Sequence, residues 1–217
     1  MVQVLYFLSI MLKLVKFIVC MFHFVFNLNF FKLIKRQLDK IYTLWICNEF
    51  DSSQTALIRC PMYLTGGRYI KIGMGFNCDQ RLRLDAFDSY LGEKFAPQII
   101  IGDNVSIQKD CHIGAINKVI LGNNVLIASK VYISDHSHGK VGVDELDCPP
   151  SNRKLYSKGP VVIGNNVWIG EGAVILPNVI IGDNCIVGAN SVVTKTFPDN
   201  CVIGGNPARI IRRLDKI

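Results

Sequence analysis

Charged residues are scarce in this chain, and the familiar motifs of several enzyme classes are missing. Asp, Glu, Lys and Arg make up 19% of the 217 residues, whereas apolar residues make up 50%. The glycines form neither a phosphate-binding loop nor a dinucleotide-binding pattern, and no Gly-x-Ser-x-Gly motif is present. The eight cysteines include no Cys-x-x-Cys pair and no Cys/His spacing typical of zinc sites. We therefore expect no metal, and we expect the cysteines to be buried free thiols in a reducing compartment.

The net charge of +7 is concentrated at the N-terminus. Residues 1–40 carry six basic side chains and one acidic one, a net charge of +5, so the rest of the chain holds only +2. A charge confined to one segment is not a general signature of nucleic-acid binding, and we expect no nucleic-acid partner.

Residues 1–31 are almost entirely apolar but do not resemble a signal peptide, because neither a charged start nor a small-residue cleavage site is present. Lys13 and Lys16 divide them into runs shorter than the roughly 20 residues of a spanning helix. In helical projection, a narrow polar stripe crosses an otherwise apolar surface and contains Ser9, Lys13, Lys16, Cys20, His23 and Asn27. We expect a helix in a membrane interface, with residues 1–40 docking on anionic headgroups. A helix packed on the rest of the protein and a true membrane span are the alternatives.

From residue 101 the sequence is periodic. An aliphatic residue recurs every six positions, usually followed by Gly or Ala, with a small or β-branched residue four places after it. This periodicity predicts a parallel β-solenoid in which three hexads complete one triangular coil. The expected coils are residues 101–118, 121–138 and 163–180, with a fourth from 181, an irregular earlier one near 69–77 and an extruded loop at 139–162.

Each hexad position has a structural role in such a solenoid. The aliphatic residue is expected to point inward and to stack on its equivalent in the next coil, about 4.8 Å away. Gly and Asn at the corners are expected to supply the positive φ angles that the turns need.

The hexads and the extruded loop resemble the left-handed β-helix acyltransferases, over about residues 70–217. The most specific stretches run from Ile163-Gly-Asn-Asn-Val-Trp through Val192-Val-Thr-Lys to Gly204-Gly-Asn-Pro-Ala-Arg. Among these enzymes the chain looks most like sugar O-acetyltransferases, such as those of maltose, galactosides, capsule, O-antigen and colanic acid. The resemblance implies an all-β, left-handed parallel β-helix after an N-terminal amphipathic helical segment. The expected divisions are a membrane-interfacial segment 1–45, an irregular start with a first coil 46–100, the acyltransferase domain 101–205 and a basic tail 206–217.

In the resembled family, a histidine just before the extruded loop is the general base, a task that suits neutral imidazole. Counting without gaps from Ile127 places His138 at that position, but His136 lies on the same face of an extended chain and could replace it. Asp135 could orient the neighbouring ring and is expected to belong to the substrate site.

The remaining site residues also follow from the resemblance. Gln108 lies where the family commonly has a substrate-binding Asn, which is a departure from the pattern. Trp168 is expected to wall the active site at a subunit junction and to contact both substrate and cofactor, or else only to pack a trimer. The coenzyme A site is implied to include Ala189, Thr194, Lys195, Arg209 and Arg212, since guanidinium groups suit phosphates.

The predicted function is therefore acetyl-CoA-dependent O-acetyltransfer to a sugar hydroxyl of a polysaccharide or glycolipid precursor, without a covalent enzyme intermediate. We expect a homotrimer, acting on a sugar or lipid-linked saccharide at the inner face of a bacterial cytoplasmic membrane. The alternatives are N-acetylation of an amino sugar, a drug or serine acetyltransferase, and a non-catalytic membrane-associated solenoid. A zinc enzyme would have only His112 and the His136/His138 pair as ligands.

Overall fold

The computed structural model describes residues 2–52, 56–140 and 142–214. The chain divides into two units, Met1–Ile41 and Tyr42–Ile217, each described separately below. The first unit is helical, whereas the second contains all the strands.

Helix α1 (Val2–Val25) and helix α2 (Leu28–Ile46) are separated by a break at Asn27. The Oδ1 atom of Asn27 accepts hydrogen bonds from the backbone N–H groups of Asn29 (3.0 Å) and Phe30 (3.2 Å). Asn27 thus caps the start of α2, so its predicted place in a single polar stripe is corrected. Within the described residues, Leu5–Val25 is long and apolar enough to cross a membrane, by length and composition alone, with a mean hydropathy of 2.1.

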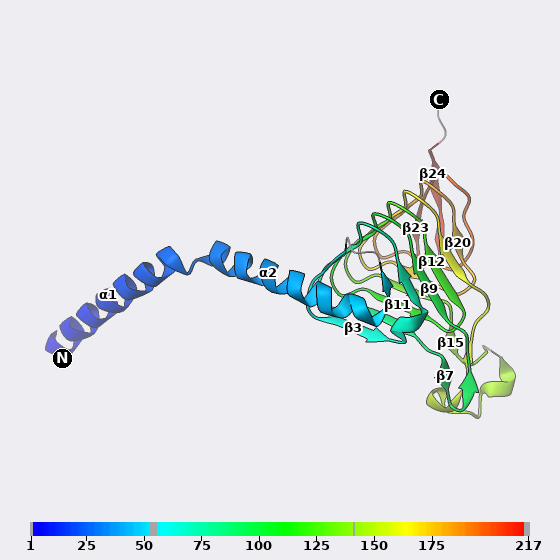
Figure 1. The fold of residues 1–217 in the computed structure, drawn as a ribbon, viewed down its shortest axis with the longest axis horizontal. Coiled ribbons are helices and arrows are strands. Elements are labelled where there is room, and N and C mark those ends of the chain that lie inside the picture. The colour runs from blue at the N-terminus through cyan, green and yellow to red at the C-terminus, as the bar shows by residue number, and fades with distance from the viewer. Residues whose placement is uncertain (1, 53–55, 141, 215–217) are drawn as a thin grey trace. The chain divides into compact units, whose positions relative to one another are not determined.

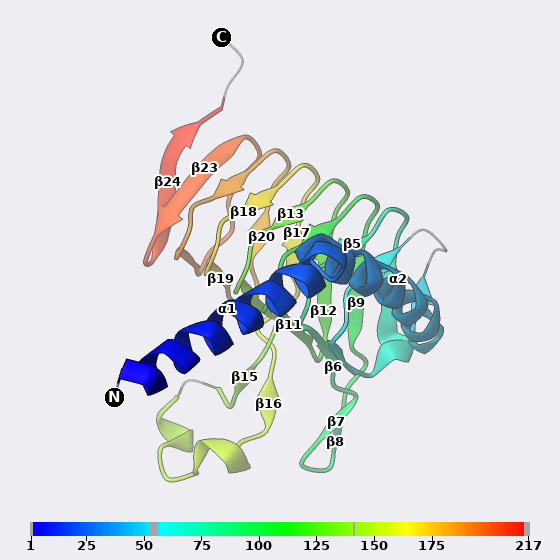
Figure 2. The ribbon, with the colours of Figure 1, turned by 90° about the vertical axis from the view of Figure 1, so that its left-hand side faces the viewer.

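The second unit is a parallel β-helix with three faces, whose stacked coils are seen in Figures 1 and 2. Within the described residues, sheets A, B and C contain six, eight and six strands. Sheet A consists of β1 (Asp51–Ser52), β4 (Ile70–Ile72), β9 (Gln98–Ile101), β12 (Lys118–Leu121), β17 (Val161–Ile163) and β20 (Ile180–Ile181). Sheet B consists of β2 (Leu57–Ile58), β5 (Asn77–Cys78), β10 (Ser106–Ile107), β13 (Leu126–Ile127), β18 (Trp168–Ile169), β21 (Ile186–Val187), β23 (Cys201–Gly205) and β24 (Ala208–Arg213). Sheet C consists of β3 (Met62–Thr65), β6 (Leu82–Ala86), β11 (His112–Ala115), β14 (Tyr132–Ser134), β19 (Val174–Ile175) and β22 (Val192–Val193).

The coils begin earlier than the hexads indicate. In the described part of the chain, two coils precede Ile101, formed by β1–β3 and by β4–β6. At the other end, β23 pairs in parallel with β21, and the antiparallel strand β24 then closes sheet B. Antiparallel pairing ends the repeat, because another parallel coil cannot stack on a strand that runs the opposite way.

The inward positions of the hexads form a continuous core. The first residue of every predicted hexad from Ile101 to Val187 is at most 2% exposed. The inward-pointing prediction is therefore confirmed. Four of the cysteines, Cys78, Cys111, Cys185 and Cys201, are buried in the same core, whereas Cys20 and Cys60 are exposed, so the expected burial is wrong for those two. Burial raises the pKa of Cys78 to about 12 and that of Cys111 to about 11, so these thiols are inert.

The coil corners confirm the expectation for Asn, and Gly172, with φ of 70° at the same hexad position, confirms it for Gly. Asn104, Asn124, Asn166 and Asn184 all have φ of 56°, and their amides form a ladder of hydrogen bonds between coils. The glycines at the second hexad position, directly after the aliphatic residue, are small for a different reason. A Cβ on Gly122 would lie 2.7 Å from the carbonyl carbon of Gly164, so close approach of successive coils requires glycine there.

Two insertions leave the corner between sheets C and A, as Figure 2 shows. The first is a hairpin of β7 (Ser89–Tyr90) and β8 (Glu93–Lys94), which the sequence analysis did not anticipate. The second contains β15 (Ser137–His138), the 3-10 turns Val143–Glu145 and Pro150–Asn152, and β16 (Leu155–Tyr156). It begins before residue 139, because β15 has already left sheet C to pair with β16. The insertions are joined by Tyr90, whose hydroxyl donates to the Ser151 carbonyl (2.9 Å), and by the Lys154–Glu93 ion pair (2.5 Å).

Candidate active site

A buried aspartate and a histidine form a fixed pair where the chain leaves sheet C. Asp135 is 0% exposed, and its carboxylate accepts hydrogen bonds from the backbone N–H groups of Ile116 (3.0 Å), Asn117 (2.8 Å) and Lys118 (2.6 Å). The same carboxylate lies 2.9 Å from Nδ1 of His136. Backbone donors leave Asp135 little freedom, so it holds the imidazole in one orientation. Its oxygens are occupied within the chain, although a substrate contact was expected of it.

The His136 ring leans back over strand β11. A Cβ on Gly114 would lie 3.2 Å from Cε1 of His136, so the ring occupies space that a larger residue would need. On its other side the ring meets Phe87 edge-on, with ring centroids 5.9 Å apart. The His136 side chain is only 12% exposed, and its Nδ1 also lies 3.2 Å from the Ser134 hydroxyl. With Nδ1–H directed to the carboxylate, Nε2 carries the free lone pair.

His138 has a different environment. It lies in β15, opposite Leu155 of β16, and is exposed. Its ring meets Tyr90 of the first insertion edge-on at 5.5 Å. Among the described residues, no carboxylate or other hydrogen-bond partner orients the His138 imidazole. Of the two histidines, His136 is therefore the one held by a carboxylate.

A second histidine–carboxylate pair, which the sequence did not predict, lies on the same face of sheet C. Nε2 of His112 is 3.1 Å from Oδ2 of Asp85, and Arg83 forms an ion pair with the same carboxylate. Burial opposes ionisation of Asp85, but hydrogen bonds from His112 and Thr65 and the charge of Arg83 hold its pKa below the ordinary value. The sequence carried no distinctive signal for this pair, because polar residues such as Lys71, Asn77 and Ser106 also occupy outward positions of other strands.

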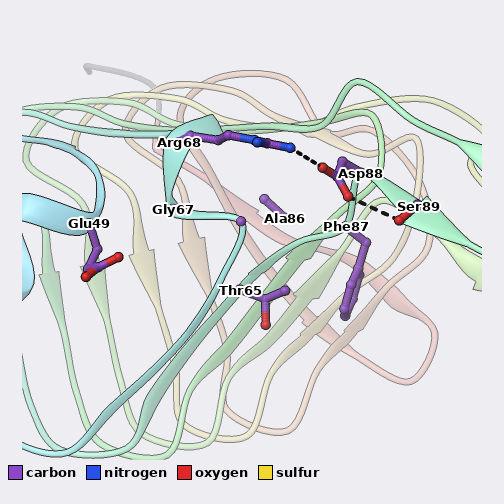
Figure 3. Close-up of a pocket in the computed structure, with 9 residues that line it drawn as sticks. Glu49, Thr65, Gly67, Arg68, Ala86, Phe87, Asp88 and Ser89 are labelled. Carbon is purple, nitrogen blue, oxygen red and sulfur yellow. Dashed lines mark hydrogen bonds and ion pairs between the residues drawn. The ribbon is translucent and has the colours of Figure 1, made fainter.

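A pocket of about 500 Å³ lies beside these groups, at the corner after β3 and β6. Its lining includes Thr65, Ala86, Phe87, Asp88 and Arg68. Figure 3 shows Arg68 bonded to Asp88 at the rim, with the side chains of Thr65 and Phe87 extending to the same side. Phe87 therefore connects the pocket to the His136 ring.

The other two expected substrate residues, Gln108 and Trp168, lie on other parts of the β-helix. Gln108 follows β10 at the corner between sheets B and C and is exposed. Trp168 points outward from sheet B and is 50% exposed, beside Leu126 at 44%. His136, in contrast, lies at the far end of sheet C. One chain thus does not bring Trp168 and His136 together on one face.

The expected coenzyme residues gather in the last coils. Ala189 follows β21, whereas Thr194 and Lys195 follow β22, and all are exposed. Arg209 and Arg212 lie on β24, opposite Gly204 and Val202. Both guanidinium side chains are exposed, and Arg209 also donates to the Ala208 carbonyl at 2.9 Å.

Comparison with known proteins identifies the family. Residues 160–195 match the family model "Bacterial transferase hexapeptide (six repeats)". The chain is 42% identical over 163 residues to WbbJ of Escherichia coli (strain K12), a protein named for O-acetyl transfer in lipopolysaccharide biosynthesis. That alignment covers 73% of this chain and 79% of WbbJ. The galactoside O-acetyltransferase of the same organism is 42% identical over 102 residues, which is 45% of each protein.

Solved structures agree with the family match. The structure of galactoside acetyltransferase in complex with coenzyme A superposes with a TM-score of 0.53 at 30% identity, covering 83% of this chain and 81% of that one. The N-acyltransferase AntD of Bacillus cereus gives a TM-score of 0.65 at 21% identity, covering 81% and 90%, and shows the fold alone. The chain therefore belongs to the hexapeptide-repeat acyltransferases, and the predicted left-handed parallel β-helix is confirmed.

Proposed function

We propose that this acetyltransferase uses acetyl-CoA to acetylate a hydroxyl group of a sugar in a polysaccharide or glycolipid precursor, with His136 as the general base. The observation that carries the proposal is the Asp135–His136 pair, in which a buried and fully bonded carboxylate holds Nδ1 of the imidazole at 2.9 Å. This assignment reverses the sequence-based preference for His138.

The pair supports direct transfer. The free Nε2 of His136 takes the proton from the acceptor hydroxyl as that oxygen attacks the thioester carbonyl carbon. The carbon–sulfur bond then breaks, and the resulting imidazolium returns its proton to the departing thiolate. Asp135 stabilises the imidazolium between these steps and keeps the ring in the reactive tautomer, so we assign it a positioning role rather than a substrate contact.

Coenzyme A is proposed to lie along the C-terminal coils. Ala189, Thr194 and Lys195 are exposed beside it, and the exposed guanidinium groups of Arg209 and Arg212 suit its phosphates. This assignment takes support from the galactoside acetyltransferase structure, which contains coenzyme A and shares 30% identity with this chain.

A homotrimer is proposed to complete the site. Trp168 and Leu126 present adjacent apolar side chains that are half-exposed in the single chain. A second copy would cover them and would bring Trp168, and Gln108 on the neighbouring corner, toward the His136 of another subunit. Light scattering of the protein in mild detergent should give the mass of three chains, and an active monomer would contradict this arrangement.

The helical unit is proposed to hold the enzyme on the inner face of the cytoplasmic membrane. Helix α1 exposes large apolar side chains such as Leu5, Phe17 and Phe24, whereas Lys13 and Lys16 lie on one stripe. An interfacial helix lets these lysines reach water, whereas a span would bury them at a cost of a few kcal/mol each. Vesicle sedimentation with and without residues 1–40 should show binding that needs this segment and anionic lipid. A protease-sensitive N-terminal tag on the far side of the membrane would instead establish a span.

The test of the function is thiol release from acetyl-CoA in the presence of p-nitrophenyl glycosides, followed by mass spectrometry of the product. We expect transfer of one acetyl group to a sugar hydroxyl, at a rate that His136→Ala lowers by roughly 10²–10⁴ and His138→Ala lowers far less. Amino-sugar acceptors form the matched arm, and acetylation confined to the amine would favour N-acetyltransfer. If coenzyme A binds but no glycoside or amino sugar is acetylated, the sugar-acceptor proposal is wrong. A failure to bind coenzyme A would favour the non-catalytic alternative.

A further inference from the structure

The outer face of sheet C carries a polar array that the proposed transfer step leaves unused. By strand register, Thr65, Asp85, Gly114 and Ser134 lie side by side on successive coils. Arg83, His112 and Tyr132 form the neighbouring row of the same face. The position between Asp85 and Ser134 has no side chain, because it is Gly114, and the His136 ring lies over it.

His112 and His136 meet at this glycine. A Cβ on Gly114 would lie 3.2 Å from Cε1 of His136 and 3.6 Å from Nε2 of His112. The two imidazoles therefore border the same small space, and a carboxylate, Asp135 or Asp85, holds each of them. A histidine placed only to fill space would need no such buried carboxylate behind it.

The two rings bind their carboxylates through opposite nitrogens. His136 uses Nδ1, whereas His112 uses Nε2. Asp85 is ionised, because the charge of Arg83 and a hydrogen bond from Thr65 stabilise its carboxylate, and it therefore accepts a hydrogen bond from the N–H of His112 Nε2. The neutral ring then presents its lone pair at Nδ1, for which no partner is found among the described residues, and the side chain is 29% exposed.

We propose that Nδ1 of His112 accepts a hydrogen bond from a second hydroxyl group of the acceptor, beside the hydroxyl that His136 deprotonates. This inference rests on the proposed function, and it identifies the acceptor as a polyhydroxylated molecule held at two points. Asp85 acts as the positioning residue of His112, as Asp135 does for His136. Tyr132, edge-on to the His112 ring at 5.3 Å, fixes the ring plane from the next coil.

Two substitutions of His112 separate substrate binding from a structural role. A glutamine amide reaches the position of Nε2, so His112→Gln keeps a donor for Asp85 but loses the group at Nδ1. An asparagine amide reaches the position of Nδ1, so His112→Asn keeps that group but loses the bond to Asp85. Kinetics would use acetyl-CoA and the p-nitrophenyl glycoside that the wild-type enzyme acetylates fastest.

We expect His112→Gln to raise the glycoside KM about five- to tenfold, the loss of one neutral hydrogen bond. The glycoside KM of His112→Asn should stay within about twofold of wild type, and both variants should keep the acetyl-CoA KM. Asp51→Asn is the control for a polar substitution elsewhere on the β-helix and should keep both KM values, because Asp51 pairs with Lys71 on sheet A, away from this face.

The opposite pattern, with Gln like wild type and Asn impaired, would mean that His112 only supports Asp85 and would overturn the inference. Equal kinetics in all three proteins would overturn it too. Failure of the proposed function looks different, because then no glycoside is acetylated or His136→Ala remains active.

Discussion

Two neighbouring rows of side chains on sheet C differ in how they change along the β-helix. The inward row, Leu64, Leu84, Ile113, Ile133, Ile175 and Val193, is aliphatic in every coil. The adjacent outward row changes from Arg83, His112 and Tyr132 in the earlier coils to Val174 and Val192 in the later ones. One backbone repeat therefore supports both a polar site and an apolar surface, because only the inward residues and the corners determine the coil.

The largest effect is expected from a substitution in the polar part of this face. His136→Ala should lower kcat by roughly 10²–10⁴, because the acceptor hydroxyl loses its base. Initial rates at saturating acetyl-CoA measure this loss, and coenzyme A affinity should hardly change. Val174→Ala, at an outward position of a later coil, is the control and should keep kcat. A near-normal kcat in His136→Ala would show that His136 is not the base. The polar and apolar parts of this face would then not differ in function.

The second-largest effect is expected from substitutions in the inward row, which should lower stability but not the reaction rate. Ile175→Ala should lower the free energy of unfolding by about 2–5 kcal/mol, since it leaves a cavity in a fully buried stack. Its neighbour Val174 is only half-buried, so Val174→Ala should cost about 1 kcal/mol or less. Urea unfolding followed by circular dichroism compares the two, and equal losses would contradict the separation of inward and outward roles.

The next effect concerns acetyl-CoA binding by the C-terminal strand β24. Arg209→Ala and Arg212→Ala should each weaken acetyl-CoA binding by about 1.5–3 kcal/mol, seen as a KM raised roughly ten- to a hundredfold. The acceptor KM should not change. Arg81→Ala, which removes an exposed arginine paired with Asp110 in an early coil, is the control. If both arginine variants keep the wild-type acetyl-CoA KM, the phosphate-binding assignment is wrong.

Substitutions at the coil corners should have the smallest effect, a modest loss of stability. Asn166 has φ of 56° and exchanges amide hydrogen bonds with Asn124 and Asn184. Asn166→Ala should cost about 1–2 kcal/mol, because alanine resists the left-handed conformation. Asn166→Gly accepts that conformation and should cost less, so the difference between the two thermal unfolding curves reports backbone strain. Identical curves would assign the whole effect to the amide ladder.

The sequence by itself determined the repeat, the inward aliphatic positions and the family. These features are local and periodic, so one hexad predicts the next, and the buried residues from Ile101 to Val187 follow the pattern throughout. The two coils before Ile101 were not predicted in full, because their hexads are irregular and only stacking on later coils makes them regular. Likewise, the break at Asn27 depends on a side-chain cap that composition does not reveal.

The sequence already placed Asp135 beside His136, but only the tertiary structure decided that this carboxylate is buried and holds the His136 ring. His136 and His138 are nearly equivalent along the chain, and counting residues favoured His138. His136 differs from His138 because the Asp135 carboxylate beside it accepts hydrogen bonds from backbone N–H groups of the preceding coil. In addition, Gly114 leaves space for the His136 ring. The Asp85–His112 pair likewise joins residues 27 positions apart. Such contacts arise between coils, whose alignment depends on the length of every insertion, and no local pattern encodes that alignment.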